Sequence, residues 1–221
     1  MTAGTIVLLR HARTAYNAGL RLQGQIDIPL DEVGRWQAEQ GATALAASHK
    51  AALVVASDLE RARDTAAAYA RHVGLQVVTD AGLRERSFGI WEGLTDAEIA
   101  ERWPAEHAVW RSGGEPPVEG VESKAAVARR MEESVLRHAE ALSPGDTLVV
   151  VSHGSAITQA VTRLLGLDPA VWRGVHGLHN VHWSHLRASG PGAEPAWRLV
   201  AHNVGAGYPL DTWQSGPEAR Q

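Results

Sequence analysis

The sequence predicts an α/β protein, a three-layer αβα sandwich with a mostly parallel central sheet. Apolar runs at residues 6–9, 53–56 and 147–152 have the length and composition of short buried strands. Each run is followed, after a loop or directly, by a segment with the pattern of a helix. This alternation is typical of βαβ units, whose right-handed crossovers cover both faces of a parallel sheet with helices.

In the first half of the chain, strands are expected at residues 6–9, 53–56 and 76–79. The helix between the first two strands opens at residues 29–32 and reaches about residue 48, with Asp31 as its N-cap. The next helix carries Arg61 on its first turn and reaches about residue 73.

In the second half, Thr95 and Glu98 have the spacing of a capping box and predict a short helix. A long helix is expected at residues 123–142, and the strand at 147–152 leads into a helix that reaches residue 165. Two further strands, at residues 179–186 and 197–204, flank a turn rich in Gly and Pro. The pattern leaves open whether an edge strand is antiparallel.

The expected organisation is a single domain over residues 1–205, with a cap-like insertion at about residues 88–122. A chain of 221 residues is long enough to bury one sizeable core. Residues 206–221 are rich in Gly, Pro and polar side chains, and we expect them to form a loose C-terminal tail.

The composition excludes several classes of function. A net charge of −4 provides no basic field for nucleic acid, and without cysteine there is neither a disulfide nor a thiolate. No apolar run approaches the ~20 residues that span a bilayer, and the N-terminal residues lack a signal-peptide pattern. We therefore expect a cytoplasmic enzyme that binds neither membrane nor nucleic acid.

Phosphate-seeking side chains recur where predicted strands end or helices begin. Arg10 and His11 follow the first strand, Arg61 begins the helix after the second, and His153 follows the strand at 147–152. The carboxyl ends of parallel strands and the N-termini of helices both bind anions. A guanidinium can grip two phosphate oxygens and a neutral imidazole can attack phosphorus. For Arg10 and His11 alone, two solvated polar residues at a strand edge are an equally good explanation.

Five motifs in order, LLRHARTAYN, RLQGQIDIPLDEVGRWQA, SDLERARDTA, LRERSFGIWEG and VVSHGSAIT, resemble the histidine phosphatase superfamily, the phosphoglycerate mutase-like proteins. The likeness covers about residues 6–165 and continues more weakly to about 205. It implies that His11 is the nucleophile that becomes phosphorylated and that Glu85 is the proton donor. It also implies a phosphate- and substrate-binding set formed by Arg10, Asn17, Gln23, Gly24, Arg61 and His153.

The implied chemistry is consistent with these residue types. Arg10, Arg61 and a protonated His153 would supply up to three positive charges, enough to hold a phosphate dianion without a metal. The leaving alkoxide needs a proton, which Glu85 would donate before the same carboxylate activates water. Taken alone, Glu85 is more simply explained as a surface ion pair with Arg84 or Arg86.

The chain departs from the family pattern directly after the nucleophile. Ala12 stands where the family usually has Gly, which is tolerable if the backbone φ stays negative. Arg13 replaces the usual Glu or Gln and adds a positive charge near the mouth of the pocket. These two changes affect the expected substrate range rather than the chemistry.

Three functions are compatible with the motifs. The first is a metal-independent phosphomonoesterase, without a cofactor, that acts on a small phosphorylated metabolite such as glucosyl-3-phosphoglycerate or another sugar or glycerate phosphate. The second is a phosphoglycerate mutase-type phosphotransferase, and the third is a non-catalytic binder of phosphorylated ligands. The short LRERSFGIWEG form resembles the phosphatase branch. The sequence leaves open whether the protein forms a homodimer.

Two other patterns suggest ligands. The histidines at positions 176, 179, 182 and 185 invite a metal site, but a strand at 179–186 would send His182 to the face opposite His179 and His185. We therefore expect no metal there. Trp91, Trp103 and Trp110 can either wall an organic substrate or pack as a core, and core packing is the simpler explanation.

Overall fold

The computed structural model describes residues 2–217 and contains a six-stranded sheet with the strand order β3-β2-β4-β1-β5-β6. Strands β1 to β4 are parallel, β5 is antiparallel to β1, and β6 is antiparallel to β5. The mostly parallel sheet is confirmed, and the antiparallel strands β5 and β6 form one of its two edges. The strands are β1 Thr5–Arg10, β2 Leu53–Ala56, β3 Val77–Thr79, β4 Thr147–Ser152, β5 Trp183–Ala188 and β6 Trp197–Val204.

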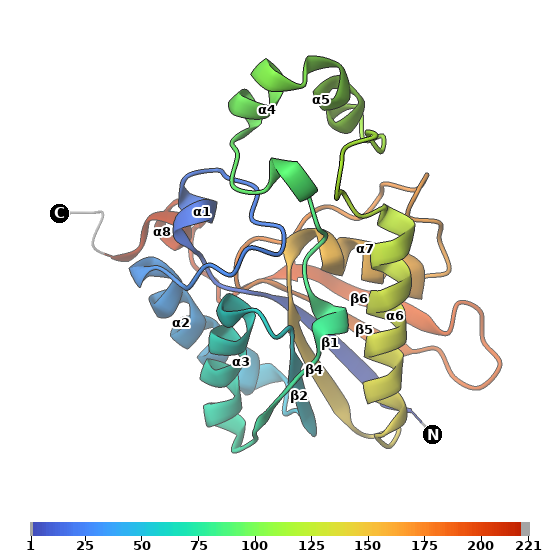
Figure 1. Cartoon of the computed structure of the whole chain (residues 1–221). Helices are drawn as coiled ribbons and strands as arrows, with labels where there is room; N and C mark the ends of the chain where they lie inside the picture. The colour runs from blue at the N-terminus through green and yellow to red at the C-terminus, as the bar shows by residue number, and fades with distance from the viewer. Residues whose placement is uncertain (1, 218–221) are drawn as a thin grey trace.

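Helices cover both faces of this sheet, which confirms the three layers (Figure 1). Ile6 and Leu8 of β1 pack with α6 and α7, whereas Val7 and Leu9 point to α2 and α3 on the other face. No helix within the described residues is both long and apolar enough to cross a membrane. The α-helices are α1 Ala15–Ala18, α2 Glu32–Ser48, α3 Glu60–Val73, α4 Asp96–Arg102, α5 Pro104–Arg111, α6 Lys124–Glu140, α7 Gly154–Leu164 and α8 Leu210–Ser215.

The helix starts follow the local signals in the sequence. The Asp31 carboxylate accepts a hydrogen bond from the Gly34 N–H at 2.7 Å and caps α2. Thr95 and Glu98 form the expected capping box at the start of α4. Since α3 begins at Glu60, Arg61 lies on its first turn as predicted.

The segment at residues 88–122 rises above the sheet and carries α4 and α5, seen at the top of Figure 1. A short 3-10 helix, η2 Gly89–Trp91, begins it. Trp91 is 1% exposed and its ring lies 6.4 Å from that of Trp103 and 5.7 Å from that of Trp110. The three tryptophans therefore pack on one another as the core of this segment.

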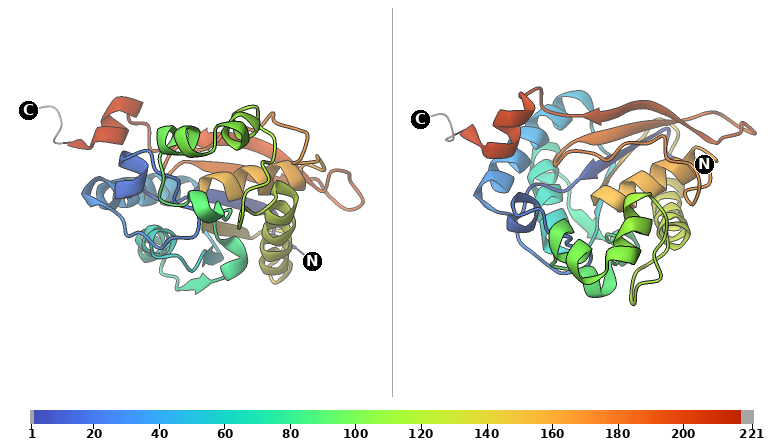
Figure 2. Two further views of the ribbon diagram at one scale, coloured as in Figure 1. Left: turned by 45° about the horizontal axis from the view of Figure 1, so that its top comes forward. Right: turned by 90° about the horizontal axis from the view of Figure 1, so that it is seen from above.

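Two segments near the C-terminus differ from the prediction. The strand expected at 179–186 begins only at Trp183, because residues 179–182 form a turn before β5. The predicted loose tail is wrong for residues 210–215, which form α8 beside α2 (Figure 2). Trp213 explains the helix: it is 1% exposed and packs in an aromatic cluster with Trp36 and Tyr208. Residues 218–221 of that prediction lie outside the described residues.

Candidate active site

The carboxyl ends of β1 and β4 bring the two predicted histidines together. The strands are parallel neighbours with Arg10 opposite Ser152, so His11 and His153 follow at the same edge of the sheet. Their ring centroids are 5.1 Å apart and both side chains are buried. The position is the one at which open α/β sheets bind ligands.

The surroundings of His11 leave one ring nitrogen available as a nucleophile. Its Nδ1 lies 2.7 Å from the carbonyl oxygen of Ala12, and because a carbonyl only accepts, Nδ1 carries the proton. The unprotonated Nε2 then holds the lone pair that attack on phosphorus requires. Burial, followed by the charges of Arg61 and Arg10, lowers the pKa of His11 well below its ordinary value, so the ring is neutral.

His153 has the complementary tautomer. Arg61 donates from Nε to Nδ1 of His153 at 3.2 Å, which places the His153 proton on Nε2. That Nε2 is buried and has no hydrogen-bond partner among the described residues. Burial and then Arg61 lower the pKa of His153 well below its ordinary value. In this geometry His153 is a neutral hydrogen-bond donor, and the expectation that it is protonated around a phosphate dianion stays a prediction.

The two arginines supply the positive charge. Arg10 donates from Nη1 to the Leu178 carbonyl at 2.5 Å, while its buried Nε has no partner within residues 2–217. Arg61 donates to the carbonyl oxygens of Gly24 and Ile26, each at 2.8 Å. Burial lowers the pKa of Arg61 to about 10, so the guanidinium remains charged at neutral pH. Unpartnered donors on Arg10 and His153 in one buried site are suited to an anion.

Glu85 occupies the N-terminus of α7. Its carboxylate accepts hydrogen bonds from the N–H groups of Ala156 at 2.8 Å, Ser155 at 3.1 Å and Arg86 at 2.8 Å. The simple alternative of a surface ion pair does not apply, because Arg84 binds Asp58 instead. Arg86 donates from Nε to the Glu122 carbonyl and lies 3.7 Å from Glu115.

The three remaining site residues have different surroundings. Asn17 accepts from Thr14 through Oδ1, and its Nδ2 amino group has no protein acceptor among the described residues. Gln23 is 8% exposed and accepts from the Thr14 hydroxyl at 2.8 Å. Gly24 has a φ of +51°, and its carbonyl holds Arg61. Gln23 and Gly24 therefore position Thr14 and Arg61, whereas Asn17 presents a donor.

The two departures from the family pattern are accommodated without strain. Ala12 is fully buried, is absent from the residues with positive φ, and donates from its N–H to the Thr65 hydroxyl at 2.9 Å. The Arg13 guanidinium pairs with Asp31 at 2.9 Å and also donates to the Gln214 carbonyl. An acidic partner thus offsets the charge that Arg13 adds.

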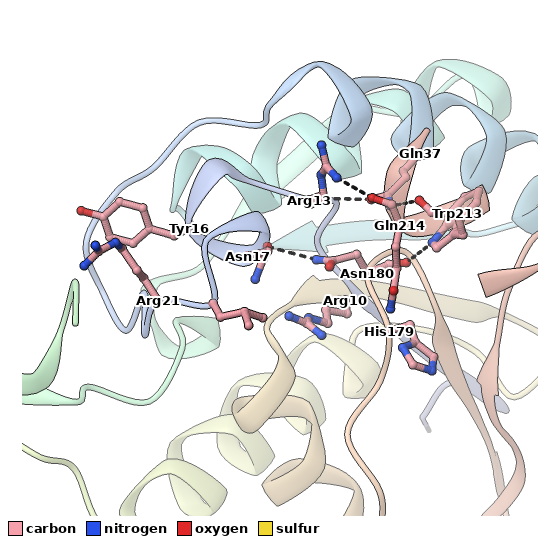
Figure 3. Close-up of a pocket in the computed structure, with 11 residues that line it drawn as sticks. Arg10, Arg13, Tyr16, Asn17, Arg21, Gln37, His179, Asn180, Trp213 and Gln214 are labelled. Carbon is pink, nitrogen blue, oxygen red and sulfur yellow. Dashed lines mark hydrogen bonds between the residues drawn. The ribbon is translucent and has the colours of Figure 1, made fainter. Parts of the chain in front are cut away.

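A pocket of about 270 Å³ adjoins the phosphate-binding groups and shares Arg10 and Asn17 with them (Figure 3). Segments from both ends of the chain form its walls, so it requires the folded structure. Its lining residues are Arg10, Arg13, Tyr16, Asn17, Leu20, Arg21, Gln37, His179, Asn180, Trp213 and Gln214.

Sequence reasoning missed the residues that hold this site in place. Asn180 donates to the carbonyl of His11, and Gln37 accepts from the Arg13 N–H at 3.0 Å. Arg130 donates to the Glu85 carbonyl at 2.9 Å from α6. Arg130 lies outside the quoted motifs, and the positions of Gln37 in RLQGQIDIPLDEVGRWQA and of Asn180 in NVHWSHL indicate no role for either residue. The partners of the three residues lie between 24 and 169 residues away in the chain.

The histidine series does not form a metal site in the structure. No group of three or more potential ligands is present in the part of the chain that the structure describes. The His179 and His182 rings lie 5.3 Å apart, because both belong to the turn before β5. His185 instead contacts His49, with a centroid separation of 4.9 Å.

Comparisons with known proteins agree with this geometry. A sequence model of the histidine phosphatase superfamily (branch 1) matches residues 6–204. A glucosyl-3-phosphoglycerate phosphatase from Mycobacterium tuberculosis is 38% identical over 217 residues, which are 93% of this chain and 97% of that protein. The sequence alone predicts a likeness to the same class of phosphatase, through the stretches RLQGQIDIPLDEVGR, LRERSFGIWEGLTDAEI and NVHWSHL.

Two further matches are a solved structure and a protein sequence. The native structure of a mycobacterial glucosyl-3-phosphoglycerate phosphatase superposes with a TM-score of 0.81 at 35% identity, covering 91% of this chain and 99% of that one. A probable phosphoglycerate mutase from Yersinia enterocolitica is 38% identical over 169 residues, covering 74% of this chain and 76% of that protein. The likeness therefore includes both phosphatase and mutase-like proteins.

Proposed function

The chain belongs to branch 1 of the histidine phosphatase superfamily and is a phosphatase, and on this premise we propose that it hydrolyses a small phosphomonoester through a phosphohistidine at His11. One observation carries the proposal. His11 and His153 face each other in complementary tautomers, one with a free lone pair on Nε2 and the other with an unpartnered N–H. A nucleophile and a donor for phosphate oxygen are thus already oriented before substrate binds.

In the first step, the phosphate oxygens accept hydrogen bonds from Arg10 Nε, His153 Nε2 and Asn17 Nδ2, with the Arg61 charge nearby. His11 Nε2 then attacks phosphorus, forming the N–P bond as the bond to the leaving oxygen breaks. The His11 proton stays on Nδ1, where it is hydrogen-bonded to the Ala12 carbonyl, and positive charge develops on the ring. Negative charge on the transferring group is offset by two guanidiniums, so we propose that no divalent metal is required.

Glu85 handles the proton in both steps. Support for this role comes from its hydrogen bonds to the start of α7 and from its proximity to the two arginines, since the Glu85 charge raises the pKa values of Arg10 and Arg61. We propose that protonated Glu85 donates to the leaving alkoxide. The resulting carboxylate then accepts a proton from the water that attacks the phosphohistidine, which releases phosphate and restores neutral His11.

For the substrate, we propose glucosyl-3-phosphoglycerate or a closely related sugar or glycerate phosphate. Support comes from the relatives of that name and from the pocket beside Arg10 and Asn17, whose polar walls give room for the non-phosphate part. The test compares kcat/KM for glucosyl-3-phosphoglycerate, 3-phosphoglycerate and a nucleoside monophosphate. The highest value is expected for the glucosyl ester; a preference for the nucleotide would contradict the proposal.

The product formed from 3-phosphoglycerate distinguishes a mutase from a phosphatase. A mutase must keep water from the phosphohistidine while the substrate reorients, whereas a phosphatase admits it. With 3-phosphoglycerate we expect released phosphate and little 2-phosphoglycerate. Rapid isomerisation without phosphate release would instead establish the mutase.

The intermediate itself is tested with a labelled aryl phosphate. The wild-type protein should retain a ³²P label that is stable in base and lost in acid, as a phosphoramidate is, and its hydrolytic activity should survive excess chelator. Both label and activity should vanish in His11→Ala. His185→Asn is the matched control, because His185 pairs with Val7 in the sheet and contacts His49 rather than the site. Activity that needs added magnesium, or label retained in His11→Ala, would overturn the mechanism.

A further inference from the structure

Residues 10–14, which we call the nucleophile loop, are held by several segments that are distant in sequence. The Ala12 N–H donates to Thr65 on α3, and the Arg13 N–H donates to Gln37 on α2. The carbonyl of His11 accepts from Asn180, which precedes β5. These bonds orient the two peptide units that follow the nucleophile.

Asn180 contacts both the nucleophile and a phosphate-binding residue. Its Nδ2 donates to the His11 carbonyl at 2.9 Å and lies 3.3 Å from Oδ1 of Asn17. The second contact fixes the Asn17 amide with its amino group available to the ligand, since Thr14 also donates to Oδ1. Figure 3 shows Asn17 and Asn180 side by side above Arg10.

Helix α8 holds the backbone of Asn180 in place through Trp213. Trp213 donates from Nε1 to the Asn180 carbonyl at 2.7 Å, and the Gln37 amide donates to the Trp213 carbonyl at 2.6 Å (Figure 3). Trp213 is 1% exposed, and its ring makes an edge contact with His182 and a tilted contact with Trp36. Gln37 therefore links α8 to the nucleophile loop by a second route, because its Oε1 accepts from the Arg13 N–H.

Helix α8 lies at residues 210–215, beyond the residues 6–204 that the family model matches. We infer that α8 and Asn180 form a relay that positions the nucleophile: Trp213 holds Asn180, and Asn180 holds the carbonyl of His11 and the amide of Asn17. Trp213 and Asn180 are positioning residues, and neither of them forms or breaks a bond in the reaction. The inference rests on the proposed function in that His11 is the nucleophile.

The relay acts through the geometry of one peptide unit. The His11 carbonyl and the Ala12 N–H belong to the same plane, which is held at one end by Asn180 and at the other by Thr65. The Ala12 carbonyl, which belongs to the next peptide unit, selects the reactive tautomer of His11. Loss of the Asn180 hydrogen bond allows this plane to rotate. The preference of His11 for the Nδ1-protonated tautomer then weakens, and Nε2 is no longer aligned with phosphorus. Misalignment of this kind lowers the rate of the chemical step by ~10- to 100-fold.

The test compares Trp213→Phe with Trp36→Phe. Both replace indole by phenyl in one aromatic cluster, but only Trp213 donates to Asn180. In Trp213→Phe the single-turnover rate of His11 phosphorylation should fall about tenfold or more, with little change in KM for an aryl phosphate. In Trp36→Phe the rate should match the wild type, although the melting temperature falls similarly. Equal rates in the two variants, or losses that follow melting temperature alone, would overturn the relay.

A double-mutant cycle asks whether Trp213 acts through Asn180. Asn180→Ala removes the side-chain amide but keeps the carbonyl that Trp213 binds, so it should slow phosphorylation at least as much as Trp213→Phe. Adding Trp213→Phe to Asn180→Ala should then cause no further loss. Fully additive losses would show two independent effects and would contradict the relay. If Trp213→Phe does not fold, the single-turnover rate of His11 phosphorylation in Asn180→Ala tests the relay instead. A rate equal to that of the wild type would overturn the inference.

A spectroscopic measurement separates this inference from the proposed function. In ¹⁵N-histidine-labelled protein, the His11 ring should show the Nδ1-protonated tautomer in the wild type and a mixture in Asn180→Ala and Trp213→Phe. The signal is assigned by its loss in His11→Ala. If the wild type proved not to hydrolyse phosphomonoesters, these spectra would still report the relay; unchanged tautomers in both variants would refute it.

Discussion

At the scale of single residues, the chemistry depends on hydrogen bonds that select a tautomer. A backbone carbonyl places the His11 proton on Nδ1, and an arginine places the His153 proton on Nε2. A donor in place of the Ala12 carbonyl, or an acceptor in place of Arg61, would favour the opposite tautomer of the histidine and so reverse the role of its ring. In the proposed mechanism the pair therefore works as a neutral nucleophile and a neutral donor, and the two arginines supply the charge that binds phosphate.

Glu85 can be tested at the same scale through the leaving group. In Glu85→Gln, single-turnover phosphorylation by a sugar phosphate should fall by ~10²- to 10⁴-fold, because an alkoxide needs a proton to leave. With a nitrophenyl phosphate the loss should be much smaller, since that phenolate leaves without assistance. The glutamine keeps one acceptor for the start of α7, and the melting temperature checks that the helix is intact. Equal losses with both substrates would assign Glu85 a packing role instead.

At the scale of elements, the loop around Gly24 links α3 to the segment at 88–122. The Gly24 carbonyl holds Arg61, and Glu92 accepts from the next residue's N–H, that of Gln25, at 3.1 Å. A Cβ placed on Gly24 would lie 2.0 Å from Oε1 of Glu92. Glycine is required here for space as well as for its φ of +51°.

Gly24→Ala and Gly74→Ala separate these two requirements. Both positions have positive φ, so each alanine should lower the free energy of unfolding by about 1 kcal/mol through backbone strain. At Gly74 nothing lies within 4 Å of the added Cβ, and activity should be unchanged. At Gly24 the added Cβ displaces the Glu92 side chain, which binds the Gln25 N–H next to the carbonyl that holds Arg61. We therefore expect kcat/KM for an aryl phosphate to fall ~10-fold or more. Full activity in Gly24→Ala would show that Arg61 does not need this loop.

At the scale of the whole molecule, the buried neutral histidines couple stability to pH. His11 and His153 have pKa values well below the ordinary 6.5 in the folded protein, whereas the unfolded chain takes up protons near 6.5. Above that pH both states are neutral and the contribution is constant. Below it the unfolded state binds more protons, so the free energy of unfolding falls as pH falls, until the folded pKa values are reached.

This loss is measured by urea unfolding of the wild type and of His11→Asn, His153→Asn. One pH unit below 6.5, each of the two histidines should have lowered the free energy of unfolding of the wild type by up to about 1.4 kcal/mol from its value at neutral pH. The double variant should lose correspondingly less over the same interval. Other histidines with lowered pKa values, such as His49 and His185, contribute equally to both proteins and cancel. Parallel curves would mean that the two site histidines titrate normally in the fold.

The architecture and the main site groups could be predicted from the sequence because their signals are local. An apolar run such as that of β1 has to be buried on both sides, and Asp31 caps α2 within one turn. Topology then places whatever follows β1 and β4 at one edge of the sheet, so His11 and His153 meet. Pattern and motif order were sufficient for these features.

Only the tertiary structure decided how the site works. The neutral state of His153, the docking of Glu85 on α7 and the relay from Trp213 through Asn180 all join segments far apart in the chain. The same reason explains why α8 was missed: a polar C-terminal segment forms a helix there because Trp213 finds a buried position against α2. Desolvation and hydrogen-bond partnership are properties of a residue's folded surroundings, and a sequence pattern carries information only about its neighbours in the chain.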